Sequence, residues 1–359
     1  MIRGQTPAES RQGSDPRLRV LGALLCALIP FSAGADAVSD IALYSGADRS
    51  AKLVEGARKE GSLNLYTSLT VEDMAALNGA FEARHGVKVR MWRATSDKVV
   101  QRVLAEAKAG RYELDIVETN APPLESLHRE GILQRVRSPQ HAELIAAALP
   151  AHGEWVGSRL NVFVQAYNTT LVSRGELPRS YADLLQPRWK GRLGIEAGDE
   201  DWFAMVVTAL GEAQGLRLFR ELVATNGVSV RRGHTLLANL VASGEVPLAL
   251  TVYNFTAEQL KRKGAPFDWF VLSPAVARAN GLALARRAPH PHAALLYYEF
   301  MISEAGQRIL EERGFLPARR SMQGALAGQP LRMVDPALML DQAEKWTRLY
   351  ESIFLSQRR

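Results

Sequence analysis

The stretch Val246-Pro-Leu-Ala-Leu-Thr-Val-Tyr-Asn-Phe-Thr-Ala-Glu-Gln259 decides the fold. Its first part, from Val246 to Tyr253, is almost entirely apolar and rich in Val and Leu. So short a run is typical of a strand buried on both faces of a parallel sheet. Asn254 and Thr256 are polar, and from Thr256 onward the spacing is helical. A buried strand that leads directly into a helix predicts an α/β sheet, where ligands bind beyond the carboxyl ends of the strands.

The same unit recurs in two series along the chain. Apolar runs that end in polar residues and continue into helices occupy residues 63–68, 87–93, 114–117, 193–195, 228–232 and 246–253. Because each crossover is right-handed, the polar ends of one series lie along one edge of its sheet. We therefore predict a two-lobed α/β protein. Each lobe has a central, mainly parallel sheet flanked by helices, and a hinge joins the lobes.

The predicted domain limits follow from the strand that links the two series. Residues 38–157 form lobe 1, and residues 279–322 return to it. Residues 158–278 form lobe 2, and residues 323–359 pack on it. A chain that crosses twice between its lobes leaves a cleft in which the two sets of strand ends face each other.

The first 37 residues have the pattern of a cleaved secretory signal peptide. Arg17 and Arg19 precede a short apolar core, and Ala35-Asp36-Ala37 ends the segment. This predicts a periplasmic protein. The single cysteine, Cys26, lies in the leader, so the mature chain has no thiol nucleophile, disulfide or cysteine metal site.

The composition limits the classes of function. The chain has 359 residues, 47% of them hydrophobic, and a net charge of +6 carried by scattered basic residues. No basic helix with interleaved aromatic residues stands out, so we expect no nucleic-acid partner. The sequence has no GxSxG elbow, P-loop, GxGxxG after a strand, HExxH or CxxC, so we expect no enzyme and no cofactor. A secreted α/β hydrolase and a ligand-sensing module remain alternatives.

The candidate ligand-binding residues stand at the predicted strand ends. They are Thr67, Ser68, Thr70, Thr95, Ser96, Thr119 and Asn120 from lobe 1, and Trp202, Arg231, Arg232, His234, Tyr253 and Asn254 from lobe 2. Arginines at a strand end bind a carboxylate or phosphate through two parallel hydrogen bonds, which favours a small anionic ligand. The acidic run 199–201 suits a cation or an amine, but carboxylates are also favoured where a helix begins. We interpret the acidic run 199–201 as the start of a helix and predict no metal ligands.

Several segments, in this order, resemble the periplasmic solute-binding proteins of ABC importers, in the family 1, type II group that contains ferric-iron-binding members. The matching segments are Leu65-Tyr66-Thr67-Ser68, Gly86-Val87-Lys88-Val89, Leu114-Asp115-Ile116-Val117, Ala166-Tyr167-Asn168-Thr169, Trp189-Lys190-Gly191, Gly244-Glu245 and Glu304-Ala305-Gly306-Gln307. The resemblance covers about residues 60–320. It implies a protein that closes its two lobes on a small molecule and docks on a membrane permease. We expect it to act as a monomer.

The resemblance does not extend to the usual ferric ligands of this group. The family's His falls on Thr70, its Glu near Asn120, and its adjacent tyrosines on Asn254 and Phe255. Ferric ion prefers anionic oxygen ligands, and these side chains do not supply them. We therefore expect no free ferric ion bound in the usual way, and a ferric-iron or ferric-complex protein is the alternative reading.

Overall fold

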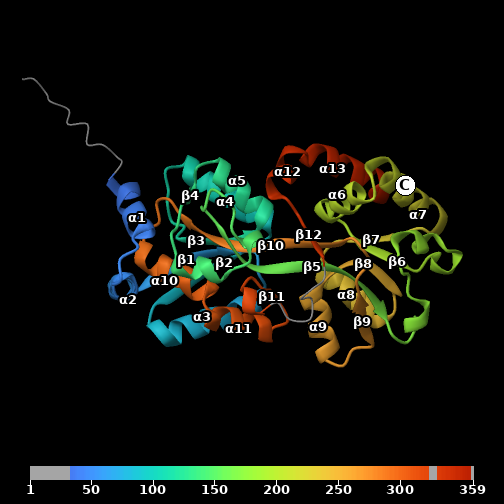
Figure 1. Cartoon of the computed structure of the whole chain (residues 1–359), viewed down its shortest axis with the longest axis horizontal. Coiled ribbons are helices and arrows are strands. Elements are labelled where there is room, and N and C mark those ends of the chain that lie inside the picture. The colour runs from blue at the N-terminus through green and yellow to red at the C-terminus, as the bar shows by residue number, and fades with distance from the viewer. Residues whose placement is uncertain (1–32, 323–329, 357–359) are drawn as a thin grey trace, which may run out of the picture.

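The computed structural model describes residues 33–322 and 330–356 (Figure 1). The predicted signal peptide, residues 1–37, lies outside the described residues except for 33–37, which begin helix α1. Of the predicted C-terminal packing segment, residues 323–329 and 357–359 also lie outside them. Every helix among the described residues is too short or too polar to cross a membrane.

Within the described residues, twelve strands pair into one continuous sheet, with the main order β2-β1-β3-β10-β5-β8-β6-β7. The strands of this path are β1 (Ser62–Thr67), β2 (Lys88–Arg93), β3 (Ile116–Asn120), β5 (Val156–Asn168), β6 (Leu193–Glu196), β7 (Ser229–Arg231), β8 (Leu248–Tyr253) and β10 (Ala275–Ala285). The remaining four are β4 (Leu133–Gln134), β9 (Phe267–Phe270), β11 (Leu316–Pro317) and β12 (Leu331–Met333). Pairing is parallel at both ends of the path, among β1, β2 and β3 and among β6, β7 and β8. The antiparallel strands β5 and β10 join these parallel parts.

The two joining strands run through both lobes of the molecule. They pair in antiparallel register from Val276↔Phe163 to Leu282↔Val156. Their neighbours lie at either end of the molecule, so the predicted two-lobed α/β fold is confirmed (Figure 1). The predicted lobe limits, at 157/158 and 278/279, fall inside β5 and β10 and stay a prediction.

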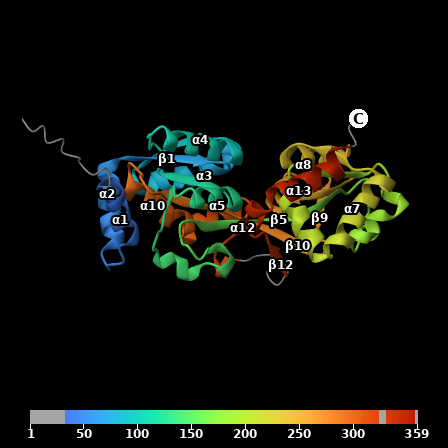
Figure 2. The same ribbon diagram turned by 90° about the horizontal axis from the view of Figure 1, so that it is seen from above.

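Helices cover the faces of the sheet at both ends, as seen from above (Figure 2). Those of lobe 1 are α1 (Ala33–Leu43), α2 (Arg49–Glu60), α3 (Val71–His85), α4 (Ser96–Lys108), α5 (Ala121–Arg129), α10 (Pro291–Ile302) and α11 (Glu304–Glu312). Those of lobe 2 are α6 (Glu200–Ala209), α7 (Glu212–Asn226), α8 (His234–Ser243) and α9 (Asn254–Arg262), and the C-terminal segment adds α12 (Pro336–Asp341) and α13 (Ala343–Tyr350). Most α-helices of both lobes follow a strand, which places their N-termini at the strand ends.

Residues 246–259 form strand β8 and the start of helix α9. All residues of β8 are buried, because the strand lies between β5 and β6 with helices on its faces. The helix begins at Asn254, directly after the strand, and Tyr253 is its N-cap residue. The predicted strand-to-helix transition is therefore confirmed.

The C-terminal helices connect the two lobes. On lobe 2, the ring of Phe203 in α6 makes edge-to-face contacts with Trp346 and Tyr350 of α13, at centroid distances of 6.1 and 5.6 Å. Such aromatic pairs add to the free energy of burial. On lobe 1, Arg129 at the end of α5 donates to Asp341 of α12 over 2.6 Å. The C-terminal segment thus contacts both sides of the hinge.

Gly281 is the tightest position in the central strand pair. A Cβ atom there would lie 2.0 Å from the carbonyl oxygen of Val156 on β5, so Gly281→Ala forces the two strands apart. We expect the free energy of unfolding to fall by about 1–3 kcal/mol, the usual effect of overpacking. Urea denaturation measures it. Gly79→Ala in α3 is the control, because nothing lies within 4 Å of its new Cβ. That change should leave stability equal or slightly raised; equal effects of both changes would contradict the analysis.

Candidate functional site

A cleft of about 1060 Å³ lies where strand ends and helix starts of the two lobes meet. Eight of the thirteen predicted residues line it: Ser68, Thr70, Thr95, Ser96, Asn120, Arg232, His234 and Tyr253. Each stands at or directly after the end of a strand, which is where the sheet topology exposes side chains.

Two predicted residues of lobe 1 lie behind the lining. Thr67 is fully buried, and its hydroxyl donates to the carboxylate of Glu118. Thr119 is also fully buried, with its hydroxyl 3.0 Å from that of Ser68 and 2.9 Å from that of Ser96. They face inward because side chains alternate along a strand. Thr119 instead holds two lining hydroxyls in place.

Three predicted residues of lobe 2 are also absent from the lining. Trp202 is fully buried within the core of lobe 2. Arg231 is the last residue of β7 and pairs with Glu245 over 3.1 Å, away from the cleft. Asn254 accepts a hydrogen bond from the backbone N–H of Val162 over 3.0 Å, which holds α9 against β5. These three predictions of cleft placement are wrong.

The crossing strands β5 and β10 bring charged residues to the cleft that were not predicted from the sequence. Arg159 on β5 and Arg278 on β10 both line it, as do Asn161 and Asn280 on the same strands. The signal in the sequence is an arginine inside a mostly apolar strand. Such an arginine can be assigned to the cleft only once it is known on which face of the sheet its side chain lies.

Both of these arginines are paired; Arg159 is buried, and the side chain of Arg278 is 11% exposed. Arg159 donates to Glu118, and the two side chains are 3% and 0% exposed. Arg278 donates to Asp201 over 2.6 Å and also to the hydroxyl of Tyr253. Burial raises the pKa of the Tyr253 phenol, and the charge of Arg278 only partly opposes this. The phenol therefore stays protonated, and Glu118 is already taken by Arg159.

Two further arginines line the cleft without a carboxylate partner. Arg93, at the end of β2, makes one hydrogen bond of 3.3 Å, to the carbonyl oxygen of Leu69. Arg232 is exposed, and within the described ranges it has neither a hydrogen bond nor an ion pair. Each lobe therefore presents one unpaired guanidinium group to the cleft.

Four helices begin at the cleft without a side-chain cap. Their N-cap residues are Thr95 for α4, Asn120 for α5, Gly233 for α8 and Tyr253 for α9, and all four line the cleft. The first N–H groups of a helix have no partner within it, and the helix dipole adds positive potential. In α5, Pro122 and Pro123 carry no N–H, so that start contributes mainly its dipole. These starts favour negative charge in the cleft.

The wall between the end of β6 and the start of α6 carries carboxylates instead. Glu196, Glu200 and Asp201 line the cleft, and Asp199 lies buried directly beneath. Burial raises the pKa of Glu200 to about 7, and the charges of its three acidic neighbours add to the rise. The run 199–201 does begin helix α6, as predicted, but Asp199 makes no side-chain cap.

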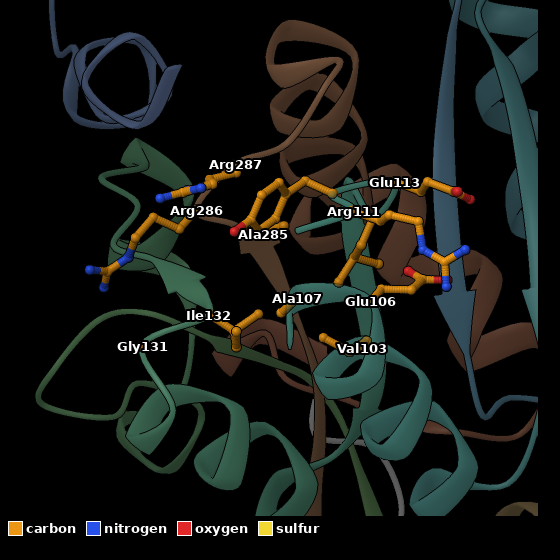
Figure 3. A pocket seen from close by; sticks show the side chains of 12 residues that line it. Val103, Glu106, Ala107, Arg111, Glu113, Gly131, Ile132, Ala285, Arg286 and Arg287 are labelled. Carbon is orange, nitrogen blue, oxygen red and sulfur yellow. The ribbon is translucent and has the colours of Figure 1, made fainter. Parts of the chain in front are cut away.

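A second pocket, of about 290 Å³, lies on the outside of lobe 1 (Figure 3). Arg111, Tyr112, Arg286 and Arg287 contribute to its lining, and it shares no residue with the cleft. The guanidinium of Arg287 stacks on the ring of Tyr112 at 4.5 Å. Leu114 precedes β3 and Ala285 ends β10, so this pocket lies at the other end of these strands from Asn120 and Asn280, which line the cleft. The cleft is the candidate ligand site.

Residues 115–341 match the model of the family described as bacterial extracellular solute-binding protein. The chain belongs to this family. The matched segment includes both crossing strands, all of lobe 2 and α12, so it contains most of the elements that form the cleft. Membership shows that the chain is a solute-binding protein, a class that takes small molecules.

Relatives with established names support the same family. The chain is 24% identical over 306 residues to iron uptake protein A1 of Synechocystis, covering 80% of this chain and 82% of that protein. It is 22% identical over 306 residues to the major ferric iron-binding protein of Neisseria meningitidis serogroup B, covering 80% of this chain and 92% of the relative.

Solved structures share the fold. Iron-bound HitA of Pseudomonas aeruginosa superposes with a TM-score of 0.72 at 24% identity, covering 81% of this chain and 99% of that one. AfuA of Actinobacillus pleuropneumoniae with fructose-6-phosphate gives a TM-score of 0.70 at 19% identity, covering 82% and 99%. At these identities the likeness establishes the two-lobed architecture of this solute-binding protein.

The buried pair beside the cleft sets a stability prediction. Arg159→Met leaves the Glu118 carboxylate buried without its cation, and we expect the free energy of unfolding to fall by about 3–5 kcal/mol. The double variant Glu118→Gln with Arg159→Met removes both charges and should recover much of this loss. Chemical denaturation of the three proteins tests it, and a double variant less stable than Arg159→Met alone would disprove the pairing.

Proposed function

We propose that this protein is the periplasmic solute-binding component of an ABC importer and that it captures a small anionic solute without altering it chemically. The observation that carries the proposal is the pair of unpaired arginines, Arg93 and Arg232, in a cleft with four uncapped helix N-termini. The protein works as a monomer that hands its solute to a membrane permease, and nucleic acid has no part in its function.

The unpaired guanidinium groups and the uncapped helix N-termini both favour an oxyanion as the ligand. Hydrogen bonds from a charged guanidinium to a carboxylate or phosphate are about twice as strong as neutral ones. Backbone N–H groups at a helix start add donors and a favourable dipole. Between them, the hydroxyls of Ser68, Thr95 and Ser96 offer further hydrogen bonds to the same oxyanion.

The mechanism is closure about the crossing strands. Arg93 lies on lobe 1 and Arg232 on lobe 2, so one solute contacts both only when the lobes approach. Such a solute binds the closed form more tightly and shifts the population toward it. The permease then distinguishes the loaded protein by its closed shape.

A ferric complex with an organic anion is the second candidate. The Synechocystis and Neisseria relatives are named for iron, and a Trichodesmium homologue of the same fold is described with iron and citrate ligands. Thr70, Asn120 and Asn254 supply no anionic ligand for ferric ion, and the Tyr253 phenol is held protonated. An organic anion that brings its own carboxylates to iron removes the need for protein carboxylates and phenolates.

The adjacent arginines Arg231 and Arg232 give a matched pair of variants. Arg232→Ala removes a cleft guanidinium, so we expect the affinity for the anionic solute to fall about 10–100-fold. Arg231→Ala removes a guanidinium that faces Glu245 outside the cleft and should leave affinity unchanged. Isothermal titration measures both, and equal affinities for the two variants would exclude the cleft arginine as an anion ligand.

A thermal-shift screen identifies the solute class. The panel contains carboxylates, phosphate and phosphonate compounds, polyamines, and ferric ion with and without citrate. A ligand at about 100 times its dissociation constant stabilises the folded state by about 2.7 kcal/mol, a readily detected shift. We expect a shift from one class of anions and none from ferric ion alone. A shift and visible colour with ferric ion alone would overturn the anion assignment.

A further inference from the structure

Three potential metal ligands meet in the lobe 2 wall of the cleft. They are Glu196 at the end of β6, Asp199 directly before α6, and His234 at the start of α8. One donor atom from each lies within 4.8 Å of the donor atoms of the other two. They are up to 38 positions apart in the chain, and the parallel strands β6 and β7 bring them together.

Asp199 is the unusual member of this cluster. Its side chain is fully buried, and among the described residues neither carboxylate oxygen has a hydrogen-bond partner of good geometry. The Nδ1 atom of His234 is likewise buried without a partner. A buried carboxylate without hydrogen bonds is costly, so such groups are normally paired or bind a metal ion.

Charge near the cluster is not balanced by the protein. In the described part of the wall, Glu196, Asp199, Glu200 and Asp201 lie around one largely buried cation, Arg278, whose side chain is 11% exposed. That guanidinium already binds Asp201 over 2.6 Å. Asp199 has only the His234 imidazole, 3.2 Å away and without a hydrogen bond, and Glu196 accepts only from the backbone N–H groups of Gly198 and Gly233.

A second cluster of the same residue types shows what a balanced arrangement looks like. It lies in lobe 1 and consists of Glu125, His128 and His152. There His128 contacts Glu154 over 2.7 Å, and His152 contacts Glu125 over 3.2 Å. Arg286 adds a cation 3.3 Å from Glu154. Its carboxylates accept hydrogen bonds from the imidazoles and from Arg286, whereas those of Asp199 accept none, so this cluster needs no ion.

We propose that Glu196, Asp199 and His234 bind a divalent transition-metal ion such as Zn²⁺. Two carboxylates and one imidazole neutralise the ion and match the oxygen and nitrogen donors that zinc accepts. The Nε2 atom of His234 lies 3.2 Å from Oδ1 of Asp199. Donors at roughly 2.0–2.1 Å from a tetrahedral ion lie about this far apart.

The proposed ion lies at the wall of the cleft, where a bound solute can contact it. Glu196 and His234 line the cleft, whereas Asp199 lies behind them, so the open coordination position faces the cleft. If the proposed function holds, an anionic group of the solute completes the coordination.

Titration of the full, untagged, metal-stripped chain with Zn²⁺ in the absence of any organic solute tests the proposal. We expect one ion per chain and a rise in melting temperature. Asp199→Asn and His234→Ala should each weaken binding by about 100-fold or more, since each removes a ligand. Without metal, Asp199→Asn should melt no lower than the wild type, because it removes an uncompensated buried charge.

The matched control is His128→Ala in the balanced cluster, which should bind Zn²⁺ like the wild type. Replacing Zn²⁺ with Co²⁺ gives visible absorption that His234→Ala alters and His128→Ala does not. Absence of Zn²⁺ binding by the wild type overturns the proposal. So does unchanged binding by both ligand variants, or loss of binding in His128→Ala alone. Because no solute is present, these outcomes are independent of anion capture.

Discussion

The antiparallel pairing of β5 with β10 is the constraint on which the rest of the structure depends. These strands are the point at which the chain passes between the lobes, and the two parallel parts of the sheet are built outward from them. They also carry Arg159 and Arg278 to the cleft, where each is held by a carboxylate from a neighbouring element. The pairing of β5 with β10 therefore determines where the chain crosses between the lobes and which charged side chains line the cleft.

Sequence reasoning located the strand ends but not the faces of the strands. Ser68, Ser96 and Asn120 were found because parallel strands expose their carboxyl ends along one edge. Thr67, Thr119 and Trp202 were misplaced because one position along a strand or helix turns a side chain into the core. Arg278 was missed because its place in the cleft depends on long-range pairing with β5. The separation of 38 positions likewise concealed the cluster of Glu196, Asp199 and His234.

The cleft has two kinds of wall, and their difference governs what it accepts. Uncapped helix starts and Arg93 make the lobe 1 side attractive to anions. The α6 side of lobe 2 gathers four carboxylates around one largely buried arginine. A solute or an ion bound between these walls experiences opposite fields at its two ends. This difference in charge orients a bound solute or ion. It also distinguishes the cleft from a metal site built around a pair of tyrosine phenolates.

The contact between Arg129 and Asp341 has a consequence for the resting molecule. The two side chains are 41% and 60% exposed, so water and salt reach the pair directly. Ion pairs of this kind are weak and are screened within about 8 Å at physiological ionic strength. The contact joins α5 of lobe 1 to the C-terminal helices anchored on lobe 2. It thus joins the two lobes through a contact whose strength falls as the salt concentration of the surroundings rises.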